Sequence, residues 1–160
     1  MLPPEGVHLV RANNPGPLSL AGTNTWVLTG GDSGKTIVID PGPALVEHLD
    51  AIRALGRPVA IVLTHQHADH SEAAPALAAE FDIPVYAALP ELAIGTRPLT
   101  DGVDIEAAGR ALTVIATPGH TSDSVCLAAG QGIFTGDTLL GGSTTIIAPR
   151  ADHSRTILRA

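Results

Sequence analysis

The sequence has few of the residues on which nucleic-acid-binding and disulfide-stabilised proteins depend. Aromatic residues make up 2% of the 160 positions, which argues against a surface on which bases would stack. Lys35 is the only lysine, basic residues form no run, and the formal net charge is −7. A general electrostatic attraction to DNA or to an anionic membrane is therefore disfavoured. Cys126 is the only cysteine, so no internal disulfide can form and a reducing compartment is compatible with the chain.

Long apolar runs are also missing. No uninterrupted stretch approaches the roughly 18 residues of a transmembrane helix. The first residues, MLPPEGVHLV, lack the basic segment and apolar core of a signal peptide. We therefore expect a cytoplasmic protein with no membrane partner. Hydrophobic residues make up 44% and charged residues 16%, a globular composition, and the length suits a single domain over residues 1–160.

Short apolar segments alternate with turns rich in glycine and proline. Strands are expected at 7–11, 25–29, 36–40, 59–63, 84–87, 103–107, 111–116, 124–128 and 133–135. Apolar residues at helical spacing predict a helix over 45–55, and a second helix is expected from Ser71 to about Phe81. The run 59–63 is continuously apolar, as in a strand that is buried on both faces. These elements predict a layered α/β protein with covered sheets.

A cluster of metal-ligating residue types follows this buried strand directly. Three histidines and one aspartate fall within six residues, namely His65, His67, Asp69 and His70. Imidazole nitrogens and carboxylate oxygens are ligands of zinc and similar ions. Residues two apart in a turn can converge on one ion, while the next acid and histidine face a second. The cluster predicts a metal site, and a polar loop with incidental histidines is the less favoured interpretation.

Two further candidates lie at the ends of other predicted strands. His120 follows the strand 111–116 within P-G-H-T, and Asp137 follows the strand 133–135 within T-G-D-T. Side chains at the ends of separate strands can meet at one edge of a sheet. Either residue alone would be read as an ordinary surface residue, but together with the cluster at 65–70 they are expected to be part of the site.

Several motifs belong to this pattern: T-H-x-H-x-D-H at 64–70, N-P-G-P at 14–17, G-T-N-T at 22–25, D-P-G at 40–42, T-P-G-H-T at 117–121 and G-D at 136–137. The pattern resembles the metallo-β-lactamase-fold hydrolase superfamily, and within it the lactamase-β-like protein 2 group. The resemblance covers residues from about 7 to 147. It implies a four-layer αβ/βα sandwich with the metals at one edge of its two sheets.

The resemblance also implies roles for the candidate residues. His65, His67 and His120 would bind a first metal, Asp69 and His70 a second, and Asp137 would bridge both. The cofactors would be two divalent ions, Zn²⁺ first and Mn²⁺ or Fe²⁺ as alternatives. A metal-bound hydroxide would attack an ester, thioester, lactone or phosphodiester, with Asp69 orienting the nucleophile or taking its proton. The bridging aspartate favours a hydrolase other than an antibiotic-destroying one.

One departure from the family pattern gives rise to the alternatives. The family supplies another histidine ligand well after the bridging aspartate, whereas here His153 is the only later histidine and has no Pro-Gly turn before it. We therefore expect the second half of the sandwich to be incomplete. The alternative functions are a catalytically impaired or non-catalytic fragment, an endoribonuclease or phosphodiesterase, and an iron-containing redox protein. A small molecule is the favoured partner, RNA is the alternative, and a homo-oligomer could form through the exposed second-half surface.

Other residues receive simpler interpretations. Asp40 ends its own strand and is the candidate for orienting a histidine ring. Thr64, Ser71 and Thr121 are read as turn or cap residues. The isolated His8 and His48 are expected to face solvent, and Cys126 and Trp26 to belong to the core.

Overall fold

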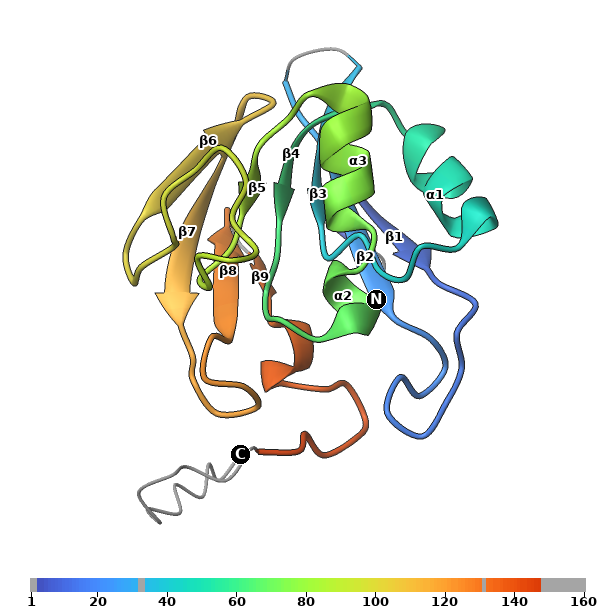
Figure 1. Ribbon diagram of the computed structural model, residues 1–160, viewed down its shortest axis with the longest axis vertical. Helices are drawn as coiled ribbons and strands as arrows, with labels where there is room; N and C mark the ends of the chain where they lie inside the picture. Colours follow the sequence, from blue (N-terminus) through green and yellow to red (C-terminus); the bar gives the residue numbers. More distant parts are fainter. Residues whose placement is uncertain (1–2, 32–33, 131, 148–160) are drawn as a thin grey trace.

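A mixed five-stranded sheet forms one layer of the molecule (Figure 1). The computed structural model describes residues 3–31, 34–130 and 132–147. The order of the sheet is β1 (Val7–Arg11), β2 (Asn24–Thr29), β3 (Lys35–Ile39), β4 (Arg57–Val62) and β5 (Val85–Tyr86). β1, β2 and β3 pair antiparallel, whereas β3, β4 and β5 pair parallel. The parallel strands β3 and β4 therefore end at the same edge, where D-P-G and the histidine cluster follow them.

The second sheet is antiparallel throughout. It contains β6 (Asp104–Ala107), β7 (Arg110–Ala116), β8 (Val125–Ala129) and β9 (Gly132–Phe134) in that order. Ala108 and Gly109 join β6 to β7 with φ angles of 49° and 69°, the conformation of a two-residue hairpin turn. Every strand predicted from the sequence is present, within two residues of its expected bounds.

The helices differ in one respect from the prediction. α1 (Val46–Arg53) lies where expected, but the predicted start of the second helix at Ser71 is wrong, because that helix is α3 (Ala74–Phe81) and Ser71 ends a separate helix, α2 (Ala68–Ser71). Pro75 lacks the amide hydrogen that would bond to the carbonyl of Ser71, which breaks the ladder between them. Ser71 ends α2, and its hydroxyl donates to the carbonyl of His67. The short helix α2 is thereby fixed directly after the loop that carries His65 and His67.

Two apolar clusters separate three layers. Strands β2 to β4 alternate their side chains, so one face of the first sheet packs on α1 and α3 and the other packs on the second sheet. The helix side is built from residues such as Val27, Val38, Leu49, Ile52, Ile61 and Leu77. The side between the sheets is built from residues such as Leu28, Ile37, Ile39, Val62, Leu112, Val114 and Leu127, with Trp26 against its edge. Cys126 is buried and Trp26 packs on this core, which confirms both core interpretations.

The described residues thus give the order helices, sheet, sheet. Across 3–31, 34–130 and 132–147, no helix covers the outer face of the second sheet. This is the predicted sandwich with an incomplete second half. Ile115 and Ile133 project from that outer face with 37% and 59% of their surfaces exposed. Within the same described ranges, no helix has the length and apolar character needed to cross a membrane.

Candidate metal centre

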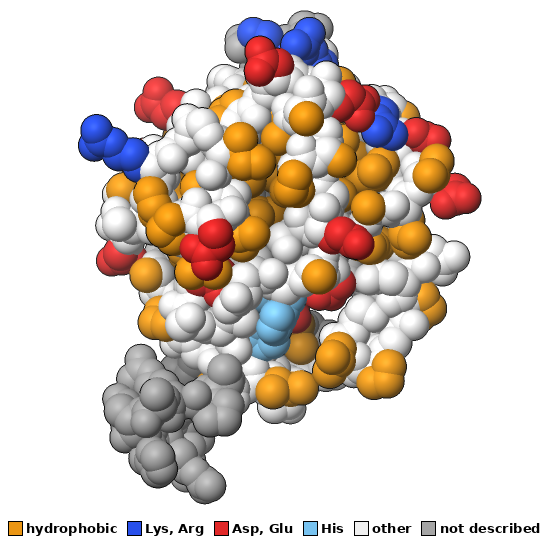
Figure 2. Space-filling view, viewed as in Figure 1, with side chains coloured by type: hydrophobic (Ala, Val, Ile, Leu, Met, Phe, Trp, Pro, Cys, Tyr) orange, Lys and Arg blue, Asp and Glu red, His pale blue; other side chains and the backbone are white. Residues whose placement is uncertain are grey.

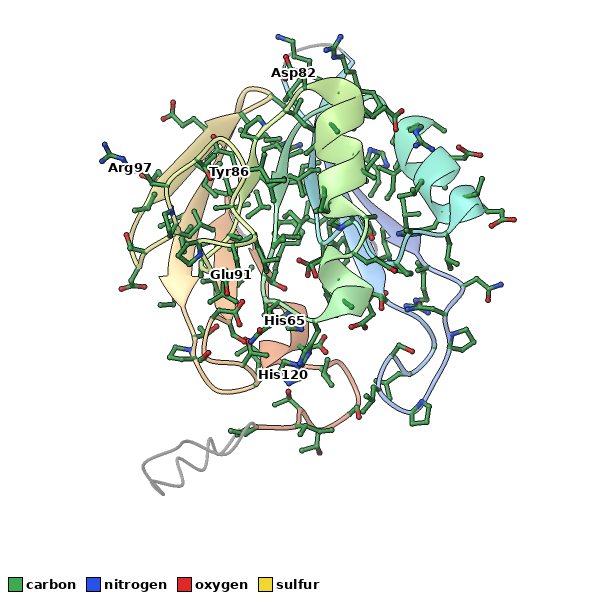
Figure 3. The ribbon with its side chains drawn as sticks, in the orientation of Figure 1. His65, Asp82, Tyr86, Glu91, Arg97 and His120 are labelled. Atoms are coloured by element: carbon green, nitrogen blue, oxygen red, sulfur yellow. The ribbon has the colours of Figure 1, made fainter. Side chains whose placement is uncertain are left out.

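The predicted ligands come from three separate parts of the chain. His65 and His67 lie in the loop after β4, and Asp69 and His70 lie in α2. His120 lies between β7 and β8, and Asp137 lies in the short 3₁₀ helix η1 (Gly136–Thr138). Figure 3 shows His65 and His120 close together at the lower edge, and Figure 2 shows histidine at the surface of this edge. The fold therefore gathers residues that are up to 72 positions apart, from 65 to 137.

Backbone contacts hold these segments against one another. The N–H of Gly42, in the turn after β3, donates to the carbonyl of His70 at 3.1 Å, and the carbonyl of Gly42 accepts from Ala73 at 3.1 Å. The N–H of Val125, at the start of β8, donates to the carbonyl of Thr64 at 2.8 Å. The loop that carries the histidines is thus tied both to the first sheet and to the second.

Three imidazole nitrogens converge on one point. His67 Nδ1 lies 3.1 Å from His65 Nε2 and 3.0 Å from His120 Nε2. Four ligands at the Zn–N distance of roughly 2.0–2.1 Å in tetrahedral geometry would place neighbouring nitrogens about 3.3 Å apart. The spacing and the chemistry of the donors therefore fit a divalent ion. His65 is buried and His67 is exposed, so the point is reachable from solvent.

Asp137 lies between this triad and a second group of donors. Its Oδ2 lies 3.7 Å from His120 Nε2, and its Oδ1 lies 3.5 Å from His70 Nε2. His70 Nε2 is also 3.6 Å from Asp69 Oδ2. The two oxygens of one carboxylate thus face two different groups of ligands, as a bridging ligand requires.

The carboxylate of Asp40 orients the ring of His70. Its Oδ2 lies 2.9 Å from His70 Nδ1 and accepts the Thr64 hydroxyl at 2.7 Å, while its Oδ1 accepts the Thr64 N–H at 2.7 Å. The predicted orienting contact of Asp40 is confirmed. Asp40 also lies within metal-ligand reach of His65 and His70. Because both of its oxygens already accept hydrogen bonds, we assign it to orientation.

Thr64 makes contacts beyond those of the turn or cap residue that was expected. Its hydroxyl lies 3.0 Å from His65 Nδ1 in addition to donating to Asp40. Gly136, beside Asp137, has φ +48°, and a Cβ there would lie 2.4 Å from the Thr64 hydroxyl oxygen. Thr64 therefore links the ring of His65 and the carboxylate of Asp40, and glycine at 136 lets η1 pack against it.

The environment shifts two histidines in opposite directions. Burial, reinforced by the nearby charge of His70, lowers the pKa of His65 to about 3. Burial also acts to lower the pKa of His70, but Asp40, Asp137 and Asp69 outweigh it and raise that pKa to about 9. Without a metal, both ring nitrogens of His70 therefore carry a proton at neutral pH. A metal ion must displace the proton on Nε2 in order to bind there.

Sequence reasoning missed several contacts to the ligands. His120 Nδ1 donates to the backbone carbonyl of Ile146 at 2.7 Å, which fixes the ring with Nε2 toward His67. The Thr23 hydroxyl donates to Asp69 Oδ2 at 2.9 Å. The G-T-N-T motif marked the loop of Thr23 as notable, but no pattern indicated a contact 46 residues away. A backbone carbonyl such as that of Ile146 cannot be recognised as a partner from the sequence, because every residue has one.

The expectation for the isolated histidines is wrong for His48. It is 5% exposed, and its Nε2 lies 2.9 Å from the Thr25 hydroxyl oxygen. Because Thr25 donates its own proton to the carbonyl of Asp40, His48 Nε2 donates to Thr25. The turn after β3 covers this face of α1, and the resulting burial lowers the pKa of His48. His8 is half-buried, and His153 lies outside the described residues.

The family comparison covers the part of the chain that carries these residues. The family model described as "Metallo-beta-lactamase superfamily" matches residues 19–159. The chain belongs to this superfamily. The match spans strands β2 to β9, helices α1 to α3 and every candidate ligand, and it begins after β1.

Individual proteins of the superfamily are similar over most of the chain. A beta-lactamase-like protein 2 homolog from Caenorhabditis elegans is 32% identical over 168 residues, covering 96% of this chain and 56% of the relative. An atrochrysone carboxyl ACP thioesterase from Aspergillus chevalieri is 34% identical over 158 residues, covering 92% of this chain and 50% of the relative. The chain spans about half the length of the curated relatives it matches.

A solved structure has the same fold. The crystal structure of ETHE1 from Myxococcus xanthus superimposes with a TM-score of 0.70 and 26% identity, covering 84% of this chain and 58% of that one. The predicted α/β class and the two-sheet arrangement are therefore confirmed.

Proposed function

We propose that this chain carries the metal centre of a hydrolase that cleaves ester or thioester bonds of small molecules. In this proposal His65, His67 and His120 would hold one divalent ion, Asp69 and His70 would hold a second, and Asp137 would contribute to both. The observation that carries the proposal is the position of Asp137, whose two oxygens lie 3.5 and 3.7 Å from the nitrogens of two different donor groups.

The ions would supply the chemistry that the side chains lack. Bound divalent ions lower the pKa of water from roughly 15.7 to about 7 and polarise a substrate oxygen. Imidazole donors favour Zn²⁺ over harder ions, with Fe²⁺ or Mn²⁺ as alternatives.

The chain's own carboxylates would position the attacking water and accept its proton. The side chain of Asp69 is 35% exposed, against 20% for Asp137 and 3% for Asp40. Asp69 is therefore the acid of the site best placed to orient an incoming water and to receive its proton. Asp40 keeps a proton on His70 Nδ1, so Nε2 faces Asp69 and Asp137 with its lone pair when the ring is neutral.

The substrate class rests on similarity and charge. The Aspergillus chevalieri relative is named a thioesterase, and the similarity covers 92% of the present chain and 50% of that relative. This supports a thioester as the substrate. The net charge of −7 and the 2% aromatic content give no support for a polyanionic substrate such as RNA.

The test combines metal counting with turnover. The purified chain is loaded with Zn²⁺, and metal content is measured by elemental analysis alongside hydrolysis of short acyl thioesters, esters and a single-stranded RNA. We expect two equivalents, thioester turnover, and a loss of at least about 100-fold in Asp69→Asn.

Asp104→Asn is the matched control. Asp104 is an exposed carboxylate on β6 that contacts Thr113, so this variant removes the same charge away from the site. Folded protein that binds no metal, or an Asp69→Asn variant as active as Asp104→Asn, would contradict the proposal. Cleavage of RNA alone would replace the substrate class.

A further inference from the structure

A directed chain of hydrogen bonds ends on the carboxylate of Asp69. The loop between β1 and β2 folds so that the backbone N–H of Thr23 donates to Asn14 Oδ1 at 2.9 Å. Asn14 Nδ2 in turn lies 3.1 Å from the Thr23 hydroxyl oxygen, and that hydroxyl lies 2.9 Å from Asp69 Oδ2. Two contacts within the loop and a third from the loop to a candidate ligand thus form one chain.

The direction of every proton in this chain is determined by chemistry. A backbone N–H can only donate, so the oxygen of the Asn14 amide must face it, and the NH₂ group must face the Thr23 hydroxyl. That hydroxyl then accepts from Asn14, and its single proton is left for Asp69. Hydrogen bonds aligned in this way polarise one another, so the last one is strengthened by the first two.

The oxygen at the end of the chain is the one that faces the second metal position. Asp69 Oδ2 is the atom that lies 3.6 Å from His70 Nε2. A hydroxyl that donates to this oxygen restricts the rotation of the carboxylate.

The loop is itself tightly fixed. Thr23 is 4% exposed, and its carbonyl accepts from Ala12 at 2.9 Å. Gly22 has φ +117°, and a Cβ there would lie 2.1 Å from the carbonyl oxygen of Ala12. Because the backbone approaches this closely, Thr23 has little freedom to move away from Asp69.

We propose that Asn14 and Thr23 are positioning residues that hold Asp69 ready for the second metal ion. This inference rests on the proposed two-metal function and deepens it. It assigns to the loop 14–23 the orientation of a ligand rather than contact with substrate.

Three variants test the direction of the chain. Thr23→Val keeps the shape and removes the hydroxyl. Thr23→Ser keeps the hydroxyl and serves as the conservative rescue. Asn14→Asp replaces the NH₂ group by an oxygen, which draws the Thr23 proton away from Asp69 and turns a lone pair toward it.

Asn24→Asp is the matched control for the charge. It makes the same substitution at the exposed residue that follows Thr23. An aspartate there keeps the side-chain oxygen that accepts from Arg11. The measurement is stepwise Zn²⁺ binding, by competition with a chromophoric chelator, together with kcat and KM for a thioester.

We expect Thr23→Val and Asn14→Asp to weaken the second equivalent about 10- to 100-fold. The first equivalent should stay within a few-fold of the wild type, and kcat should fall more than KM changes. Thr23→Ser and Asn24→Asp should behave as the wild type does.

The outcomes separate this inference from the proposed function. A wild-type chain that binds no second equivalent defeats the two-metal function itself. A wild-type chain that binds two equivalents, with Thr23→Val and Asn14→Asp indistinguishable from it, overturns only the positioning role. Equal losses in Thr23→Ser and Thr23→Val would mean that packing, and not the hydroxyl, matters, which also overturns it.

Discussion

Replacing Asp40 by Asn should weaken the second metal position more than the first. Asp40 accepts from the N–H of Thr64, the hydroxyl of Thr64 and His70 Nδ1. An asparagine that keeps the bond to the N–H must turn its NH₂ group toward His70 Nδ1. The imidazole can then accept only by moving its proton to Nε2, the nitrogen that faces Asp69 and Asp137.

The size of the effect follows from the contacts of that one carboxylate. The opposite amide rotamer restores the bond to His70 but sets the NH₂ group against the N–H of Thr64, and a buried unpaired donor costs about 1–3 kcal/mol. The lost hydrogen bond to a charged group is worth about 1.5–3 kcal/mol. Both figures agree with the roughly 10- to 100-fold loss of affinity that follows removal of a partner of a metal-ligating histidine.

Stepwise Zn²⁺ titration measures this effect, with circular dichroism to establish that the variant is folded. Asp104→Asn is the control for the charge. The reasoning fails if folded Asp40→Asn binds its second equivalent as tightly as the wild type, or if both equivalents weaken by the same factor.

Three further predictions concern stability. Because burial lowers the pKa of His48, this side chain is protonated near pH 6.5 in the unfolded chain but stays neutral in the folded chain. The contribution of neutral His48 to folding stability is therefore fully present above pH 6.5, and it is lost as the pH falls toward the lower pKa of the folded state. Thermal melts between pH 7 and about 5 should therefore show a steeper decline for the wild type than for His48→Gln, and parallel declines would contradict this. Gly136→Ala should destabilise the chain by about 1–3 kcal/mol in urea titrations, because φ is +48° and the Cβ would meet Thr64; an unchanged midpoint would argue against the strain. Ile61→Ala, at a fully buried site in β4, should cost about 2–5 kcal/mol in the same assay, and a cost below that range would mean that the core closes around the cavity.

Local patterns predicted the strands and the positions of the candidate ligands for the same reason. A strand that is buried on both faces is visible as a continuous apolar run, and a polar cluster directly after it must lie at the edge of the sheet. His65, His67, Asp69 and His70 are therefore placed by their neighbours in the sequence. His120 and Asp137 follow the same rule at the ends of β7 and β9.

The contacts that sequence reasoning missed depend on the tertiary fold. Whether the hydroxyl of Thr23 reaches Asp69 depends on how the loop after β1 closes over α2. His48 was expected to face solvent because it is an isolated histidine on the helical pattern of α1. Its burial comes from Thr25 in β2 and from the turn after β3, neither of which belongs to that pattern. Pro75 could have corrected the predicted helix 71–81, since the missing amide hydrogen is readable from the sequence itself.

The origin of the ligands has a thermodynamic consequence. His65 and His67 follow a strand of the first sheet, whereas His120 and Asp137 follow strands of the second. An ion held by all of them would bind only while the two sheets are docked. By mass action, such an ion at 1,000 times its dissociation constant adds about 4 kcal/mol to the stability of the docked form. Metal concentration would therefore set how often the sheets separate, and amide hydrogen exchange in the core between them would slow as the metal concentration rises.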